Sequence, residues 1–251
     1  MVMVHGLGEH SGRYTTLANT FSQEGFCVWA PDLYGHGQSG GPRGDIASFD
    51  DYLDAVRAVL HLASRNRENR LPQILLGHSM GGLICLKVAL QRPDLIDAVV
   101  VSSPLLALNR NVPATQLFLV RCMACLWPGL PLKNGVNAHW LSHDPHQVQA
   151  YLNDPAVHDR ITARWLNQVI QAMAALHAEG ARMVTPILMQ VAGADRVVDP
   201  DGAKRFFDSL VLPDRKLVIY EGLYHEIYNE REDLRTGVLQ DLQNWLTAHL
   251  T

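Results

Sequence analysis

The sequence QILLGHSMGG at residues 73–82 decides the fold of this chain. Its first four residues form a short, largely apolar run, which is typical of a buried strand. The G-x-S-x-G pattern from Gly77 to Gly81 follows directly and predicts a tight strand-to-helix turn that lifts the Ser79 hydroxyl above the sheet. Glycines suit this turn because a Cβ atom would clash with the neighbouring backbone. We therefore predict Ser79 as a nucleophile, with a helix that begins near Met80 and favours negative charge at its N-terminus.

A second G-x-S-x-G match contains Ser39, in the stretch from Gly37 to Gly41. No strand candidate leads into this match, and Pro42 and Gly44 follow where a helix would have to begin. The context therefore predicts a loop around Ser39 and not a nucleophile.

Short apolar runs alternate with helical patterns along most of the chain, which is typical of a parallel sheet covered by helices. The runs are rich in Val, Ile and Leu, as expected for strands buried on both faces. The strand candidates are Met1–His5, Phe26–Ala30, Gln73–Leu76, Ala98–Val101, Ile187–Val191 and Lys216–Tyr220, and the helix candidates are Phe49–Ser64, Leu83–Gln91 and Leu234–Leu250. We expect an all-parallel sheet with Phe26–Ala30 at one edge, then Met1–His5, then the others in chain order.

The alternation stops between residues 104 and 184, where we find helix-like runs and no strand candidate. These runs are Gln116–Leu126, His146–Leu152 and Ile161–Ala178, with turns such as Pro128-Gly129 between them. A structureless loop of this length is improbable in a compact domain. We therefore predict a core of residues 1–103 and 185–251, with residues 104–184 inserted as a helical cap.

A serine hydroxyl needs a base, because it is not ionised near neutral pH. Asp195 and His225 each follow a predicted strand, at the sheet end where Ser79 also lies. The chain order of serine, acid and histidine is that of α/β-hydrolases, which predicts His225 as general base and then acid, and Asp195 as the group that orients it. Asp199 and Asp201 follow the same strand as Asp195, but their place beside Pro200 favours the start of a helix.

An acyl-transfer site also needs two backbone N–H groups that face the developing oxyanion. Met80, directly after the nucleophile, is predicted to supply one of them. The turn after the first strand, His5-Gly6-Leu7-Gly8, is predicted to supply the Leu7 N–H as the other.

Composition excludes several classes of protein. The 251 residues are 47% hydrophobic and 18% charged, which is enough apolar material for a large core. The net charge of −4 provides no basic field for nucleic acid, and no apolar run reaches the roughly 20 residues of a membrane span. The apolar start from Met1 to Val4 is too short for a signal peptide, which predicts a cytoplasmic protein. Cys122 and Cys125 have C-x-x-C spacing without a partner pair, so we predict no metal site and no cofactor.

Several stretches carry a resemblance to a known family. The sequence HGLGEHSGRY at residues 5–14 resembles the opening motif of monoacylglycerol lipases and related lysophospholipase-like α/β-hydrolases, and PDLYGHGQS at residues 31–39 is similar to their next loop. The serine turn, the GADR turn at residues 193–196, Tyr224-His225 and the cap stretch at residues 154–160 match as well. The resemblance implies an α/β-hydrolase fold and a serine hydrolase that cleaves monoacylglycerols or similar single-chain esters. It also implies that Glu9 and Arg13 lie near the glycerol end of the site as a charge pair.

The chain departs from this family at two places. Family members carry two further strands before the one that ends in His5-Gly6, whereas here that strand begins at Met1, so we expect these two strands to be absent. Phe26–Ala30 would then be an apolar edge strand, which predicts self-association through this edge. Tyr228 stands where some monoacylglycerol lipases carry a histidine.

The cap is expected to supply an apolar pocket for the acyl chain and to make transient contact with a membrane or micelle. The candidates for the pocket, among which Trp127 and Trp165 are expected to contact substrate, are Leu105, Leu106, Leu117, Phe118, Trp127, Leu130 and Trp165. Three alternatives stay open: a general carboxylesterase or lysophospholipase, an acyltransferase or C–C bond hydrolase on the same triad, and a non-catalytic binding protein with a hydrolase fold.

Overall fold

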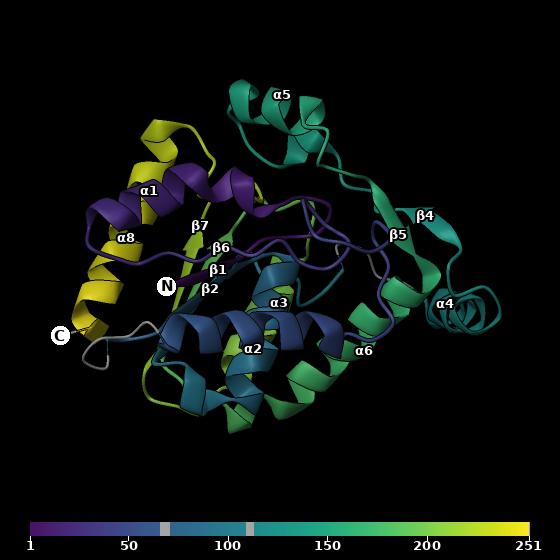
Figure 1. Cartoon of the computed structure of the whole chain (residues 1–251), viewed down its shortest axis with the longest axis horizontal. Helices are drawn as coiled ribbons and strands as arrows, with labels where there is room; N and C mark the ends of the chain where they lie inside the picture. Colours follow the sequence, from purple (N-terminus) through teal and green to yellow (C-terminus); the bar gives the residue numbers. More distant parts are fainter. Residues whose placement is uncertain (66–70, 109–112, 251) are drawn as a thin grey trace.

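The computed structural model describes residues 1–65, 71–108 and 113–250 of the chain. Within these residues, the centre is a parallel five-stranded sheet in the order β1-β2-β3-β6-β7 (Figure 1). Its strands are β1 (Val2–Val4), β2 (Ile74–His78), β3 (Ala98–Ser102), β6 (Ile187–Ala192) and β7 (Arg215–Tyr220). Five of the six predicted strands are therefore present in the predicted order, and the predicted fold class is confirmed.

Helices cover both faces of this sheet. One face carries α1 (Thr15–Gln23) and α8 (Glu232–Leu250), and the other carries α2 (Asp50–Arg65), α3 (Met80–Gln91), α6 (Ala163–Glu179) and α7 (Pro200–Ser209) (Figure 1). Short 3-10 turns lie at Ser11–Tyr14, Pro93–Leu95, Ala138–Trp140 and Gly180–Arg182. None of the described helices combines the length and the apolar composition that crossing a membrane requires.

Alternate residues of each strand face opposite helical layers, which explains why the strands are mostly apolar. In β3, Val99 and Val101 pack among residues of α2, α3 and α6. Ala98 and Val100 point the other way and pack among residues of α1 and α8. Because helices shield both faces of the sheet from water, positions on either face favour an apolar side chain.

The prediction of a strand at Phe26–Ala30 is wrong. Only Trp29 reaches β1, through a single parallel bridge to Val2. The Trp29 N–H donates to the Met1 carbonyl (2.9 Å), and the Met3 N–H donates to the Trp29 carbonyl (2.8 Å). The segment is short because α1 ends just before it and Pro31, which has no N–H to donate, follows it directly.

The segment between β3 and β6 contains α4 (Ala114–Leu126), β4 (Pro131–Lys133), α5 (Pro145–Asn153), β5 (Arg160–Thr162) and α6. We call residues 104–184 the cap segment; its residues 109–112 lie outside the described residues. The expectation of no strand here is wrong, because β4 and β5 form an antiparallel pair. Each of these strands has three residues, which is too short to give a visible sequence period. Thr162 belongs to β5 and caps α6, where its side chain accepts from the Trp165 N–H (3.1 Å).

Candidate active site

Ser79 lies at a strained turn between β2 and α3. Its backbone has φ 53° and ψ −118°, a left-handed φ that is uncommon for a residue with a side chain. The Ser79 N–H donates to the Ser102 carbonyl (3.0 Å), and the Ser79 carbonyl accepts from the Leu105 N–H (2.9 Å). These bonds to the end of β3 hold the turn in place. Strain of this kind persists only where the surroundings fix it, and it clusters at functional sites.

Close backbone approach explains the glycine at position 81. A Cβ atom on Gly81 would lie 2.2 Å from the Val4 carbonyl oxygen and 2.6 Å from that of His5. The first turn of α3 therefore touches the end of β1, and only glycine leaves the room for this contact. The contact brings the loop after β1 beside Ser79.

Asp195 and His225 meet at the same end of the sheet. The Asp195 Oδ2 atom lies 2.6 Å from His225 Nδ1, and the Asp195 Oδ1 atom accepts the N–H groups of Val197 (2.8 Å) and Val198 (3.0 Å). Both side chains are buried, and His225 lines the same cavity as Ser79. One carboxylate oxygen is thus fixed by backbone and the other faces the imidazole, which is the arrangement that orients a general base.

Two histidines lie together at this site with opposite pKa shifts. Burial lowers the pKa of His225, but the Asp195 carboxylate outweighs it, so the pKa is raised and the imidazolium is favoured. Burial, followed by the charge of His225, lowers the pKa of His78 to about 4, so His78 is neutral at pH 7. The two rings are 4.7 Å apart between centroids. His225 is therefore the one of the two that can take up a proton near neutral pH.

The rival residues lie elsewhere. Asp199 caps the N-terminus of α7 by accepting from the Asp201 N–H (3.0 Å), and Asp201 pairs with Lys204 (2.8 Å). Ser39 lies in a loop, and its hydroxyl donates to the Asp32 carbonyl (2.6 Å). None of these residues lines the cavity that contains Ser79 and His225.

The loop after β1 packs directly against the nucleophile. A Cβ atom on Gly6 would lie 3.2 Å from the Ser79 Cβ and 2.8 Å from a Glu9 carboxylate oxygen. The described residues contain no hydrogen-bond acceptor for the N–H groups of Leu7 and Met80. Both donors are thus available, and their role as an oxyanion hole stays a prediction.

A buried ion-paired cluster lies beside this loop and consists of Glu9, Arg13 and Glu226. Glu9 accepts from the Gly6 N–H (2.6 Å), the Tyr14 hydroxyl (2.7 Å) and Arg13 Nη1 (2.7 Å). Arg13 also makes two bonds to Glu226, from Nη1 (2.6 Å) and from Nη2 (2.8 Å). Glu9 and Arg13 are therefore a charge pair beside the cavity, and Glu226 is a third member that the sequence analysis did not identify.

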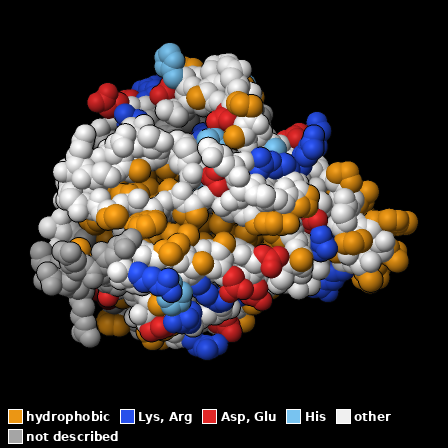
Figure 2. Space-filling view, viewed as in Figure 1, with side chains coloured by type: hydrophobic (Ala, Val, Ile, Leu, Met, Phe, Trp, Pro, Cys, Tyr) orange, Lys and Arg blue, Asp and Glu red, His pale blue; other side chains and the backbone are white. Residues whose placement is uncertain are grey.

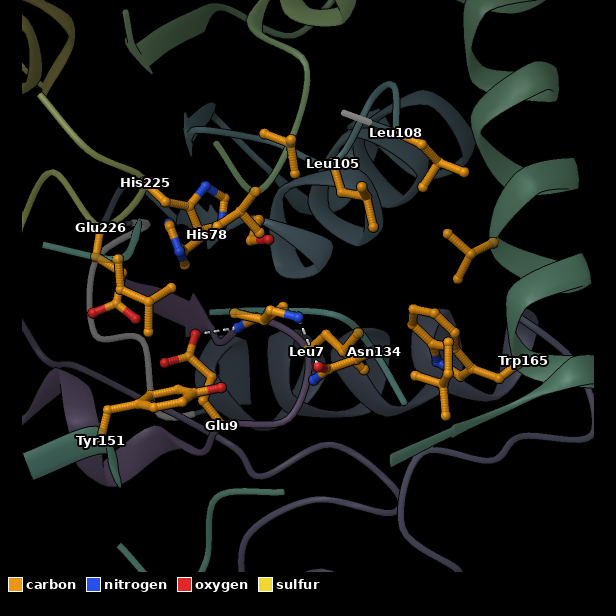
Figure 3. A pocket seen from close by; sticks show the side chains of 18 of the residues that line it. Leu7, Glu9, His78, Leu105, Leu108, Asn134, Tyr151, Trp165, His225 and Glu226 are labelled. Atoms are coloured by element: carbon orange, nitrogen blue, oxygen red, sulfur yellow. Dashed lines mark hydrogen bonds between the residues drawn. The ribbon is translucent and has the colours of Figure 1, made fainter. Parts of the chain in front are cut away.

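The cavity above Ser79 has two chemically different sides (Figure 3). Its volume is about 110 Å³. The carboxylates of Glu9 and Glu226 lie at one side together with Tyr151, and Trp165 lies at the other (Figure 3). The apolar lining consists of Leu7, Leu105, Leu108, Val136, Leu141, Ile161, Trp165, Leu166, Val169, Val197 and Val198.

Two of the seven predicted acyl-pocket residues line this cavity, namely Leu105 and Trp165. Trp165 is fixed by its Nε1, which donates to the Tyr52 hydroxyl (3.1 Å). The expectation for Trp127 is corrected, because its side chain is 66% exposed and lines no part of the cavity. The reason is that α4 packs against α6 and leaves its outer face, where Trp127 ends the helix, open to solvent.

Tertiary contacts bring in residues that no local pattern indicated. Tyr151, Asn134 and Val136 come from the cap segment, and Glu226 comes from the loop after β7. For Glu226 the only sequence signal is its position directly after His225. Tyr228 turns away from the cavity, and its hydroxyl donates to Gln190 Oε1 (2.6 Å).

Comparisons with known proteins agree with this geometry. The family model described as "Serine aminopeptidase, S33" (Hydrolase_4) matches residues 1–232. A monoacylglycerol lipase of Mycolicibacterium smegmatis is 33% identical over 100% of this chain and 88% of its own length, and the phospholipase YtpA of Bacillus subtilis is 32% identical over 93% of this chain and 91% of its own length. The crystal structure of a monoacylglycerol lipase of Paleococcus ferrophilus has a TM-score of 0.90 and 36% identity, covering 99% of this chain and 93% of that one. The chain therefore belongs to the Hydrolase_4 (serine aminopeptidase, S33) family of α/β-hydrolases.

Proposed function

We propose that this protein hydrolyses monoacylglycerols to fatty acid and glycerol through an acyl-enzyme on Ser79. The observation that carries the proposal is the 2.6 Å contact of Asp195 with His225, at a cavity that Ser79 also lines and that has one apolar and one carboxylate side. The similarity to monoacylglycerol lipases over the whole chain supports the same substrate.

In the first half-reaction, Ser79 Oγ attacks the ester carbonyl carbon while His225 takes the hydroxyl proton. The carbonyl oxygen becomes an oxyanion and is bound by the N–H groups of Leu7 and Met80. The tetrahedral intermediate then collapses, the C–O bond to glycerol breaks, and His225 gives its proton to the leaving glycerol oxygen. Asp195 stabilises the imidazolium that forms between these steps.

In the second half-reaction, water takes the place of glycerol. His225 removes a proton from this water, whose oxygen attacks the acyl carbon of the Ser79 ester. The same two N–H groups bind the second oxyanion, and the proton returns from His225 to Ser79 Oγ as the fatty acid leaves. The raised pKa of His225 favours its role as proton carrier in both halves.

The test of this proposal is release of fatty acid from a monoacylglycerol by the purified protein, followed over time beside an amino-acid p-nitroanilide and an added alcohol acceptor. We expect fatty acid and glycerol as products. Transfer of the acyl group to the alcohol without hydrolysis would favour an acyltransferase, and cleavage of the anilide alone would favour a peptidase. A protein without turnover would support the non-catalytic alternative.

We propose further that residues 104–184 act as a cap that touches the lipid surface through α4. The exposed apolar side chains at this end of the molecule are Phe118, Leu119, Leu126, Trp127 and Leu130. Figure 2 shows hydrophobic side chains gathered where α4 lies. A patch of this kind, rimmed by polar residues, is typical of a membrane-contact surface. The cytoplasmic location stays a prediction from the sequence.

The double variant Phe118→Ser with Trp127→Ser is expected to lower activity on monoacylglycerol vesicles by about tenfold, because less apolar surface can enter the lipid interface. Activity on a soluble short-chain p-nitrophenyl ester should stay within about twofold, since neither residue lines the cavity. Val211→Ser is the matched control, because Val211 is 73% exposed but lies between α7 and β7, outside the cap segment. Equal losses on both substrates would contradict a surface role for α4.

We also propose that the chain self-associates through the Phe26–Ala30 segment. Trp29 exchanges hydrogen bonds with Met1 and Met3, whereas the described residues hold no partner for the N–H and carbonyl of Val28. A cavity of about 250 Å³ beside the segment is lined by Phe26, Cys27 and Trp29 among others. Unpaired edge groups next to apolar surface favour pairing with a second chain.

Light scattering of the purified protein is therefore expected to show a mass that rises with concentration, because a second copy covers this edge. Val28→Lys should shift the protein toward the monomer, since an inward-facing charge blocks edge pairing. A wild-type protein that stays monomeric at high concentration would contradict this proposal.

A further inference from the structure

The carboxylate side of the cavity exposes negative charge to the substrate, whereas the guanidinium of Arg13 does not line the cavity. Glu9 and Glu226 line the cavity, and Arg13 does not. The side chains of Glu9, Arg13 and Glu226 are 4%, 7% and 5% exposed. The cluster therefore shows its two carboxylates, and not its guanidinium, to a bound alcohol group.

Arg13 already donates three of its five N–H groups to these carboxylates. Its Nη1 donates to both Glu9 (2.7 Å) and Glu226 (2.6 Å), and its Nη2 donates to the second Glu226 oxygen (2.8 Å). The Tyr151 ring covers it, with its centroid 4.9 Å from Arg13 Cζ. The Nη1–Nη2 fork of Arg13, which could bind a phosphate in bidentate fashion, is thus occupied by the two carboxylates.

Two carboxylates and one guanidinium leave this cluster with a net charge of −1. Burial would raise the pKa of Glu9, but the charge of Arg13 outweighs it and lowers this pKa to about 2, so Glu9 is ionised at neutral pH. Ionised carboxylates only accept hydrogen bonds, so the hydroxyl groups of a polyol are their natural donors. A phosphate ester carries two or nearly two negative charges at neutral pH and would meet like charge here.

The geometry points to Glu226, together with Glu9, as the determinant that selects uncharged, hydroxyl-bearing alcohol groups and rejects anionic headgroups. Glu226 is the added element, because its charge takes the cluster from neutral to −1. This inference rests on the proposed function, since it concerns the alcohol end of the same ester site. It separates a monoacylglycerol from a lysophospholipid by the charge of the leaving alcohol and not by the acyl chain.

A second cavity carries charges of both signs. It has a volume of about 520 Å³, is lined by Arg43, Arg160, Asp154 and Asp159 among other residues, and shares Asn134, Val136 and Tyr151 with the first cavity. A phosphate that passed Tyr151 into this cavity would leave Glu9 and Glu226 and meet two arginines beside two aspartates. The charge of the phosphate would then not lower kcat/KM. A comparison of charged and neutral esters therefore distinguishes binding beside Glu9 and Glu226 from binding in the second cavity.

The experiment compares three esters of the same fatty acid: 1-monoacylglycerol, 1-acylglycerol 3-phosphate, and the dimethyl ester of that phosphate. The dimethyl ester keeps the bulk of the phosphate and removes its charge. We expect kcat/KM for the phosphate to be lower than for monoacylglycerol by more than about tenfold, and the dimethyl ester to recover most of the difference, because charge and not size is rejected.

Glu226→Gln is expected to reduce the preference for monoacylglycerol over the phosphate by about tenfold, because it removes one negative charge and keeps the side-chain shape. Glu230→Gln is the matched control. Glu230 is fully buried in the same loop and accepts from Ser142 (3.2 Å), His143 (2.8 Å) and the Tyr224 N–H (2.9 Å), but it does not line the cavity. The Glu230→Gln substitution should change kcat/KM for all three esters by the same factor.

Ionic strength provides a readout that a merely structural role would not move. Raising salt from about 0.01 M to about 0.15 M should increase hydrolysis of the phosphate more for the wild-type protein than for Glu226→Gln, because the net charge of −4 acts on both proteins alike, and it should leave the two neutral esters unchanged. Equal rates on all three esters, or a Glu226→Gln variant that alters all three equally, would overturn the inference alone. Absence of hydrolysis on every ester, monoacylglycerol included, would overturn the proposed function with it.

Discussion

Ser79→Ala is expected to lower kcat on monoacylglycerol by about 10⁶-fold, and His225→Ala by a similar factor. The first change removes the only atom at the strained turn that can form the acyl-enzyme. The second leaves that atom with no base, because His78, the neighbouring ring, has its pKa lowered to about 4 and faces Ser102 at 3.2 Å. Single-turnover release of fatty acid measures both losses, and residual activity should come from the oxyanion donors alone.

The double variant of Ser79 and His225 should be no worse than either single variant, since the two residues act as one unit. Losses that add up would show that they work independently and would contradict the assignment. A fluorophosphonate probe gives a second readout, because it should label wild-type Ser79 and leave both single variants unlabelled. Thermal unfolding of each variant checks that the fold is intact.

Asp195→Asn is expected to lower kcat by about 10⁴-fold, through the wrong histidine tautomer. Asp195 Oδ1 accepts two backbone N–H groups, from Val197 and Val198, so the amide oxygen must occupy that position. The amide NH₂ then faces His225 Nδ1, 2.6 Å away in the wild-type protein. His225 must accept there and carry its proton on Nε2, where it can no longer take the proton of Ser79.

Asp199→Asn is the matched control for this change, because Asp199 follows the same strand but caps α7 and pairs with Arg205 (3.5 Å), away from the cavity. It should leave kcat within a few-fold of wild type and change stability little, because asparagine caps a helix N-terminus about as well as aspartate. If Asp195→Asn were nearly silent while Asp199→Asn abolished turnover, the acid of the triad would be wrong. The pH dependence of kcat/KM adds a test. The Asp195 variant should lose the raised pKa of the His225 imidazole, so the fall in activity on the acid side, where His225 becomes protonated, should move to lower pH.

The local pattern of the chain determined the scaffold. Buried parallel strands need apolar residues on both faces, and this composition marked β2, β3, β6 and β7 within one or two residues. The turn at Ser79 is equally local, because a strand, two glycines and a helix start lie in ten consecutive residues. The position of Asp195 and His225 after their strands follows from the same order, since parallel strands end at one edge of the sheet.

Residues without a local pattern could not be predicted in this way. Trp127 and Trp165 are alike in the sequence, but α6 packs on the core and buries one, while the outer face of α4 exposes the other. Phe26–Ala30 reads as a strand and makes only one bridge, because the lengths of α1 and of the turn at Pro31 decide how far it follows β1. The pairing of Arg13 with Glu226 joins residues 213 positions apart.

The sequence by itself thus determined the sheet, the nucleophile turn and the order of the three triad residues, because these depend on contacts between neighbours in the chain or on rules for parallel strands. The shape and charge of the substrate cavity were decided by the tertiary structure. Glu226 and Tyr151 enter the cavity wall only because the loop after β7 and the cap segment pack against each other. The charge that a substrate encounters there is negative because Glu9 and Glu226 line the cavity and Arg13 does not. Such choices arise from packing between distant segments, and no periodicity in the chain encodes them.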